Sequence, residues 1–244
     1  MHMALAERLI ADFTVPRVVC DLLSANWGAF LFGSIAPDAR VSSGLQRADT
    51  HFFEYGPRVE PPPVAAMLSA YPQLRRVAVP SDAHAAFIAG YAAHLAMDAV
   101  WCTDLLFPVF VESAWGTQPT KFLVLHLLLA NLDRRDRALL PERHYSQLSG
   151  AAPQHWLPFI DDASLLVWRD TIASQLAPGA ASQTVTILGQ RINRSAAEIE
   201  TILNDETQMQ QLTWDNVPLP VLRQTEDAMY RACLDTVTAF LTPY

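Results

Sequence analysis

The arrangement of apolar and polar positions predicts helices along most of the chain. Alternation with a period of two, which marks a half-buried strand, is scarce throughout. Helices are instead predicted over residues 4–12, 17–25, 64–71, 82–106, 119–138, 162–176, 183–191, 195–203 and 221–241. We therefore expect an all-α protein, folded as a compact multi-helix domain that spans residues 1–244.

Residues 82–106 carry the strongest helix signal. Pro80, Ser81 and Asp82 provide a helix start, and no further proline occurs until Pro108. The segment is apolar on nearly all sides, which is typical of a helix surrounded by other helices. We expect it to be the central buried helix of the fold.

Two stretches lack a clear helical pattern. The first runs from Trp27 to Asp38: it opens as an apolar run and closes with Gly, Pro and Asp, which are turn residues. In the second, residues 39–63, we expect an irregular excursion, which inside a compact domain is usually functional or mobile. Only Pro178-Gly179 has the composition of a linker, and it is too short to indicate a second domain.

The composition narrows the class of protein. Hydrophobic residues make up 51% of the chain and charged residues 17%, as in a folded globular protein. The formal net charge of −8 argues against an extended nucleic-acid surface, although it is compatible with one phosphodiester held at a metal ion. Three widely separated cysteines, Cys20, Cys102 and Cys233, are typical of reduced thiols in the cytoplasm.

The N-terminal part of the chain indicates no secretory signal. Residues 1–13 include Glu7 and resemble an amphipathic helix. The longest apolar run, residues 83–100, is interrupted by His94 and Asp98, so we expect no transmembrane segment. We expect a cytoplasmic protein, and the sequence leaves its oligomeric state open.

The sharpest chemical feature is the His94-Leu-Ala-Met-Asp98 segment of the predicted central helix. Residues four apart lie on the same helix face, so both side chains can reach one metal ion. An unpaired Asp would be costly to bury in a helix with so few polar groups. A buried His–Asp hydrogen bond between two helices would explain the pair equally well, and the segment alone leaves both interpretations open.

Three further residues are candidate metal ligands. Asp38 ends a turn, His51 stands beside Phe52 and Phe53, and His2 begins the first predicted helix. Taken singly, each has a simpler structural explanation, namely a capping Asp, a packing His and a frayed terminus.

Asp104 and His126 are a more remote candidate pair. Asp104 lies on the same predicted helix as Asp98 but is turned away from the face of the His94 pair, and His126 lies in an apolar part of the 119–138 helix. A capping Asp and a core His explain these two residues slightly better than a ligand pair. No GxGxxG, P-loop, GxSxG or HExxH motif indicates another chemistry.

In their order and spacing, the candidate ligands resemble the zinc-dependent phospholipase C family, which shares its helical fold with the fungal single-strand nucleases. The resemblance extends over residues 1–130, and residues 140–244 are predicted to be helical but have no match to the family. It rests on a His that opens a helix, His2, on Gly-Ser-Ile-Ala-Pro-Asp ending at Asp38, on Thr-His-Phe-Phe at 50–53, and on Gly-Tyr-Ala-Ala-His-Leu-Ala-Met-Asp at 90–98.

The resemblance implies a set of ligands and a role for each. Asp38, His51, His94 and Asp98 would bind one zinc ion. Asp98 would bridge to a second ion that His2 also holds, and Asp38 would act in addition as the general base.

The chain departs from the family pattern in two places. The family holds a further zinc with a His six residues after the bridging Asp and with a His and a Glu one helical turn apart. Here Asp104 stands at the first of these positions and Ala130 follows His126 in place of Glu, so this third site is incomplete. Secreted members also use the free amino end of the mature chain as a ligand, whereas here only Met1 precedes His2.

The resemblance therefore implies a hydrolase with two zinc ions that activates a metal-bound water on a phosphodiester. Manganese or iron would also suit histidine and carboxylate ligands. The expected substrate is a small phosphate ester, of which a lipid head group is one example. The alternative is a metal-binding helical protein of a different kind, either a redox-metal enzyme or a non-catalytic protein, on the same scaffold.

Overall fold

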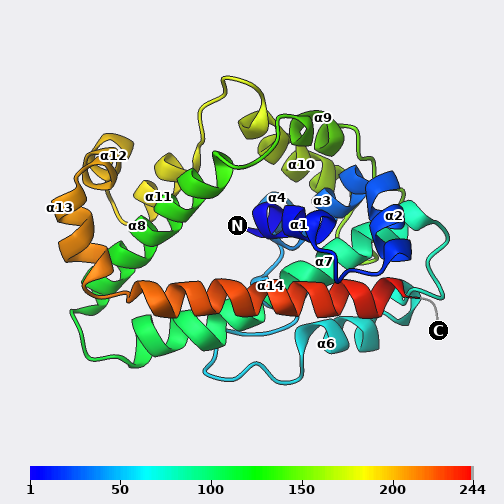
Figure 1. Cartoon of the computed structure of the whole chain (residues 1–244), viewed down its shortest axis with the longest axis horizontal. Helices are drawn as coiled ribbons and strands as arrows, with labels where there is room; N and C mark the ends of the chain where they lie inside the picture. Colours follow the sequence, from blue (N-terminus) through cyan, green and yellow to red (C-terminus); the bar gives the residue numbers. More distant parts are fainter. Residues whose placement is uncertain (243–244) are drawn as a thin grey trace.

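The computed structural model describes residues 1–242, and every regular element among them is a helix (Figure 1). The first half comprises α1 (His2–Ala11), α2 (Arg17–Ala25), α3 (Trp27–Ile35), η1 (Ala36–Ala39), α4 (Arg40–Ser43), α5 (Arg47–His51), α6 (Pro63–Ala70), η2 (Pro72–Leu74), α7 (Asp82–Trp101) and η3 (Cys102–Glu112). The second half comprises α8 (Gln118–Arg137), α9 (Arg143–Ser149), α10 (Asp162–Leu176), α11 (Thr184–Arg191), α12 (Ala196–Asn204), α13 (Glu206–Met209), η4 (Gln210–Trp214) and α14 (Leu219–Leu241). The predicted all-α class is confirmed.

The expectation of an irregular excursion over residues 39–63 was wrong for part of that segment. Residues 40–43 and 47–51 form α4 and α5, and the chain is irregular over residues 44–46 and from residue 52 to the start of α6. Helices α3 and α9 and the pair α13 and η4 were not predicted either, and α3 occupies residues 27–35 of the first stretch in which no helix was expected. A helix of four residues, such as α4 or α13, is too short to show a period, so tertiary packing decides whether it forms.

The helix that begins at Asp82 continues beyond its predicted end at residue 106. After Trp101 the chain turns as a π-helix through η3 to Glu112, and this wider turn contains Pro108. The continuous helix over residues 82–112 is long and apolar enough to cross a membrane. The two helical segments at residues 17–25 and 27–43, which are bent relative to each other, are long and apolar enough only when they are counted as one. A buried helix in the core of a soluble protein can be equally long and apolar.

Helix α7 is the centre of the main hydrophobic core. It packs chiefly against α3 and α14, and most of its residues from His84 to Met97 are buried. Figure 1 shows α14 running along the length of the molecule, with α8 and α11–α13 at the end opposite α2. Two smaller apolar clusters surround α8, one against η3 and one against α11 and α12.

Two glycines allow α3 and α7 to touch through their backbones. A Cβ atom placed on Gly33 would lie 1.9 Å from the Phe87 carbonyl oxygen, and one on Gly90 would lie 2.2 Å from the Phe30 carbonyl oxygen. No side chain larger than hydrogen fits at either position. The contact brings the C-terminal end of α3 directly onto the face of α7 that carries His94.

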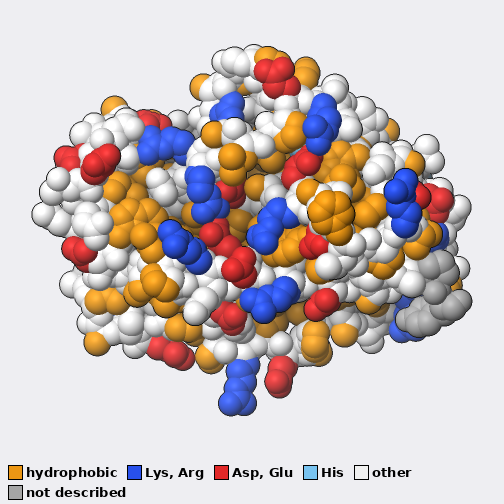
Figure 2. Space-filling model, in the orientation of Figure 1, with side chains coloured by type: hydrophobic (Ala, Val, Ile, Leu, Met, Phe, Trp, Pro, Cys, Tyr) orange, Lys and Arg blue, Asp and Glu red, His pale blue; other side chains and the backbone are white. Residues whose placement is uncertain are grey.

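The surface in Figure 2 is mixed in charge. Basic and acidic side chains are interspersed on this face, with apolar patches between them, and they do not gather into a continuous basic area.

Candidate metal centre

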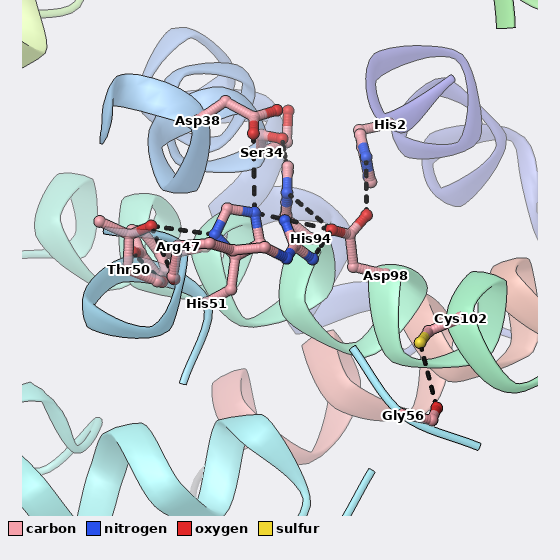
Figure 3. Close-up of polar contacts among 11 residues, drawn as sticks. His2, Ser34, Asp38, Arg47, Thr50, His51, Gly56, His94, Asp98 and Cys102 are labelled. Atoms are coloured by element: carbon pink, nitrogen blue, oxygen red, sulfur yellow. Dashed lines mark hydrogen bonds and ion pairs between the residues drawn. The ribbon is translucent and has the colours of Figure 1, made fainter. Parts of the chain in front are cut away.

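Four elements from the first half of the chain bring five side chains to one place (Figure 3). His2 is the first residue of α1, Asp38 lies in η1, and His51 ends α5. His94 and Asp98 lie one turn apart on α7. Their ligand atoms form two overlapping groups, one of His2, His94 and Asp98 and one of Asp38, His51 and His94, and within each group all these atoms lie within 4.8 Å of one another.

The separations between these atoms are those expected around an ion. Oδ1 of Asp98 lies 3.4 Å from Nε2 of His2, while Oδ2 of Asp98 lies 3.6 Å from Nε2 of His51 and 3.7 Å from Nε2 of His94. Oδ1 of Asp38 lies 3.6 Å from Nε2 of His51. These distances are too long for good hydrogen bonds. Adjacent ligands of a tetrahedral zinc with bonds of about 2.0–2.1 Å would lie about 3.3 Å apart.

Hydrogen bonds on the other ring nitrogen orient His51 and His94. Nδ1 of His94 donates to the Ser34 carbonyl oxygen at 2.8 Å, which leaves the lone pair of the ring on Nε2. Nδ1 of His51 donates to the Thr50 hydroxyl oxygen at 2.9 Å, because that hydroxyl donates its own proton to the Arg47 carbonyl oxygen. Nε2 of both rings is buried and has no hydrogen-bond partner among residues 1–242. A buried lone pair without a partner is costly unless it binds a ligand.

The protonation states suit a cation. Burial is the larger cause and the electrostatic influence of the neighbouring His94 the second, and together they lower the pKa of His2 to about 4 and that of His51 to about 2. Burial alone would raise the pKa of Asp98, but its electrostatic interactions with His94, His2 and Arg47 and the polar contact with His2 outweigh burial and hold that pKa well below its ordinary value. At neutral pH, His2 and His51 are therefore neutral and Asp98 is ionised, as metal ligands must be.

The lowered pKa values predict how the metal-free protein responds to acid. We expect its free energy of unfolding to fall as the pH drops from 6.5 towards 4, because the unfolded state then binds protons that folded His2 and His51 do not accept. Each such histidine contributes a slope of up to about 1.4 kcal/mol per pH unit. Urea unfolding of the chelator-treated protein at several pH values measures this slope.

The matched variants are His51→Asn and His155→Asn. The His155 side chain is 96% exposed, so its removal should leave the slope unchanged, whereas removal of His51 should flatten it. Equal slopes in the two variants would contradict the burial argument.

Arg47 belongs to the same cluster, although no sequence motif marked it. It opens α5, one turn before His51, and its Nη2 donates to Oδ2 of Asp98 at 2.7 Å. The guanidinium carbon lies 4.3 Å from the ring centre of Tyr55 and 5.0 Å from that of Phe53. The one-turn spacing from His51 is the signal that could have drawn attention to it.

The remote candidates Asp104 and His126 are not brought to the cluster. Asp104 is exposed on η3 and accepts a hydrogen bond from the Thr103 hydroxyl at 2.7 Å. His126 is buried on α8 and donates from Nδ1 to the Phe122 carbonyl oxygen at 2.7 Å. Within residues 1–242, no ion pair joins these two and neither belongs to a group of three potential metal ligands.

The fold and the cluster together define a helical protein with a candidate His/Asp metal centre. Residues 1–101 match the family described as zinc dependent phospholipase C. The matched part comprises α1 to α7 and carries all five clustered side chains, so the chain is similar to this family over somewhat less than half of its length. The match ends before Asp104 and His126, short of the expected limit at residue 130. No curated protein and no solved structure shows significant similarity to the chain.

Proposed function

We propose that this protein is a di-zinc hydrolase of phosphodiesters, of the phospholipase C type. The observation that carries the proposal is the spacing of the imidazole and carboxylate atoms, which is too wide for hydrogen bonding and suits a shared ion. The buried, unpartnered Nε2 atoms of His51 and His94 point to the same conclusion. The match of residues 1–101 to the zinc-dependent phospholipase C family supports zinc as the metal.

The carboxylate of Asp98 supports two ions rather than one. Its Oδ1 faces His2, and its Oδ2 faces both His51 and His94 (Figure 3). We assign Asp38, His51, His94 and Oδ2 of Asp98 to one ion, and His2 and Oδ1 of Asp98 to the other. Nitrogen and oxygen donors of this kind suit zinc, and manganese or iron would also be accommodated.

Asp38 is the residue of this set best placed to handle a proton. Its side chain is 42% exposed, whereas that of Asp98 is 19% exposed and those of His51 and His94 are almost fully buried. Bound zinc supplies Lewis acidity, which polarises a phosphoryl oxygen and lowers the pKa of the attacking water. The Asp38 carboxylate would accept the proton of that water and orient it towards phosphorus.

A pocket beside the cluster supports a small substrate with an apolar part. It has a volume of about 280 Å³, and both His2 and Asp38 line it. Ile35 from α3 and Trp168 from α10 are among its apolar walls. A phosphate ester held at the cluster, such as the head-group region of a lipid, could place an apolar substituent there.

Zinc reconstitution followed by an activity assay tests the proposal. We expect elemental analysis to give two zinc ions per chain, and the loaded protein to hydrolyse bis-p-nitrophenyl phosphate. A chelator should abolish the hydrolysis and added zinc should restore it.

Two other outcomes would contradict the proposal. A chain that retains no metal after reconstitution would exclude the metal centre altogether. A chain that binds metal but cleaves no phosphodiester would instead support a non-catalytic metal protein or, if it selects iron or manganese, a redox enzyme.

A further inference from the structure

The guanidinium of Arg47 has far more hydrogen-bonding capacity than the structure uses. Among the residues that the structure describes, the five N–H donors make one bond to a protein acceptor, from Nη2 to Oδ2 of Asp98. Nε is buried and has no partner within that part of the chain, and the side chain as a whole is only 14% exposed. A nearly buried charge with unpaired donors is costly unless another acceptor completes it.

The surroundings hold the guanidinium in place without using its remaining donors. Phe53 and Tyr55 lie against it as aromatic neighbours. Their segment is anchored in turn by Cys102, whose thiol donates to the Gly56 carbonyl oxygen at 3.4 Å. The planar group is therefore positioned before any ligand arrives, which reduces the entropy lost on binding.

The positive charge of Arg47 is unusual beside a site that is expected to bind cations. Two divalent ions would outweigh the carboxylates of Asp38 and Asp98, and Arg47 adds one more positive charge in direct contact with Asp98. A bound anion would offset this excess of positive charge. An anion with several oxygens could bind the ions and still offer an acceptor to the guanidinium.

We propose that Arg47 binds a non-bridging oxygen of the phosphate group that occupies the metal centre. This inference rests on the proposed function, and it makes Arg47 part of the substrate site. The shared chemistry is a tetrahedral phosphorus oxyanion, whether free phosphate or the phosphodiester of a larger molecule. The competing explanation is that Arg47 only orients Asp98 as a metal ligand.

Binding measurements on zinc-loaded protein separate these two roles. We compare wild type, Arg47→Gln and Arg47→Lys by calorimetric titration with inorganic phosphate and, separately, with diethyl phosphate. Arg58→Gln is the control, because Arg58 is exposed and lies in the irregular segment that follows α5. Zinc content is measured on each sample by elemental analysis.

We expect Arg47→Gln to retain its zinc and to bind the oxyanion about 10–100-fold more weakly, as for loss of a hydrogen bond between charged groups. Arg47→Lys, which keeps the charge but not the planar fork, should retain zinc and show a smaller loss. Arg58→Gln should match wild type. A loss for diethyl phosphate alone would assign Arg47 to the diester, and a loss for inorganic phosphate alone would assign it to the free anion.

Two results would overturn the inference. One is an unchanged affinity of Arg47→Gln for both probes. The other is a fall in zinc content that parallels the fall in affinity, because it would show that Arg47 only positions a metal ligand. If Arg47→Gln fails to fold, Arg47→Lys decides the question by the same criteria. If the wild-type protein hydrolyses the diester and Arg47→Gln binds both probes with normal affinity, only this inference is refuted. If the binding of the probes depends on Arg47 but no diester is hydrolysed, only the proposed activity is refuted.

Discussion

Replacement of Asp98 by Asn is expected to remove more than one metal ion per chain. Both oxygens of this carboxylate face imidazole nitrogens, Oδ1 towards His2 and Oδ2 towards His51 and His94. An amide offers one neutral oxygen in place of the shared anion, so both ions lose a ligand together. Because loss of an outer partner of a metal ligand already costs about 10–100-fold, loss of the bridge should lower hydrolysis by about 100-fold or more.

Elemental analysis and the rate of bis-p-nitrophenyl phosphate cleavage measure these effects in the same preparations. Asp21→Asn is a suitable control, because the Asp21 side chain is 63% exposed and its ion pair with Arg17 lies on the surface of α2. Circular dichroism verifies that both variants are folded. Loss of one ion or none in Asp98→Asn would show that the carboxylate does not bridge and that the centre holds a single ion.

The second large effect is expected from Gly33→Ala. The added Cβ would lie 1.9 Å from the Phe87 carbonyl oxygen and 3.0 Å from the Tyr91 nitrogen, and neither backbone atom can move without displacing α7. We expect a loss of about 3 kcal/mol or more in the free energy of unfolding, at the upper end of overpacking effects. The shift would also move the Ser34 carbonyl away from His94, so zinc affinity should fall as well.

Denaturant unfolding of the metal-free protein measures the stability change without interference from zinc. Gly150→Ala provides the comparison, because that glycine is exposed and a Cβ there would meet nothing closer than 3.2 Å. A Gly33→Ala variant within 1 kcal/mol of wild type would be incompatible with the backbone contact described here.

The longer helices could be predicted from sequence because their signals are local. The helix over 162–176 was predicted with its correct ends, and Asp161 caps it by accepting a hydrogen bond from the Ser164 amide. Helices α4 and α5 could not be predicted in this way. They are four and five residues long, and contacts with distant segments decide whether they form.

Only part of the candidate site could be predicted from the sequence. The same-face geometry of His94 and Asp98 follows from helix periodicity alone, but the sequence could not distinguish a metal pair from a hydrogen-bonded pair. The order of His2, Asp38 and His51 indicated the family. The roles of Ser34, Thr50 and Arg47 depend on their contacts with ring nitrogens and a carboxylate in the folded chain. Of these three residues, only Arg47 has a local signal, which is its spacing of one helical turn from His51.

The packing of α14 against α7 has a consequence for the biosynthesis of the metal centre. All five clustered side chains lie within residues 1–98, so a ribosome delivers them before it delivers α14. The helix that holds two of them is nevertheless covered by Met229, Cys233 and Val237 of α14. Until those residues emerge, α7 lacks part of its apolar packing. We therefore expect tight binding of the ions to follow the synthesis of α14.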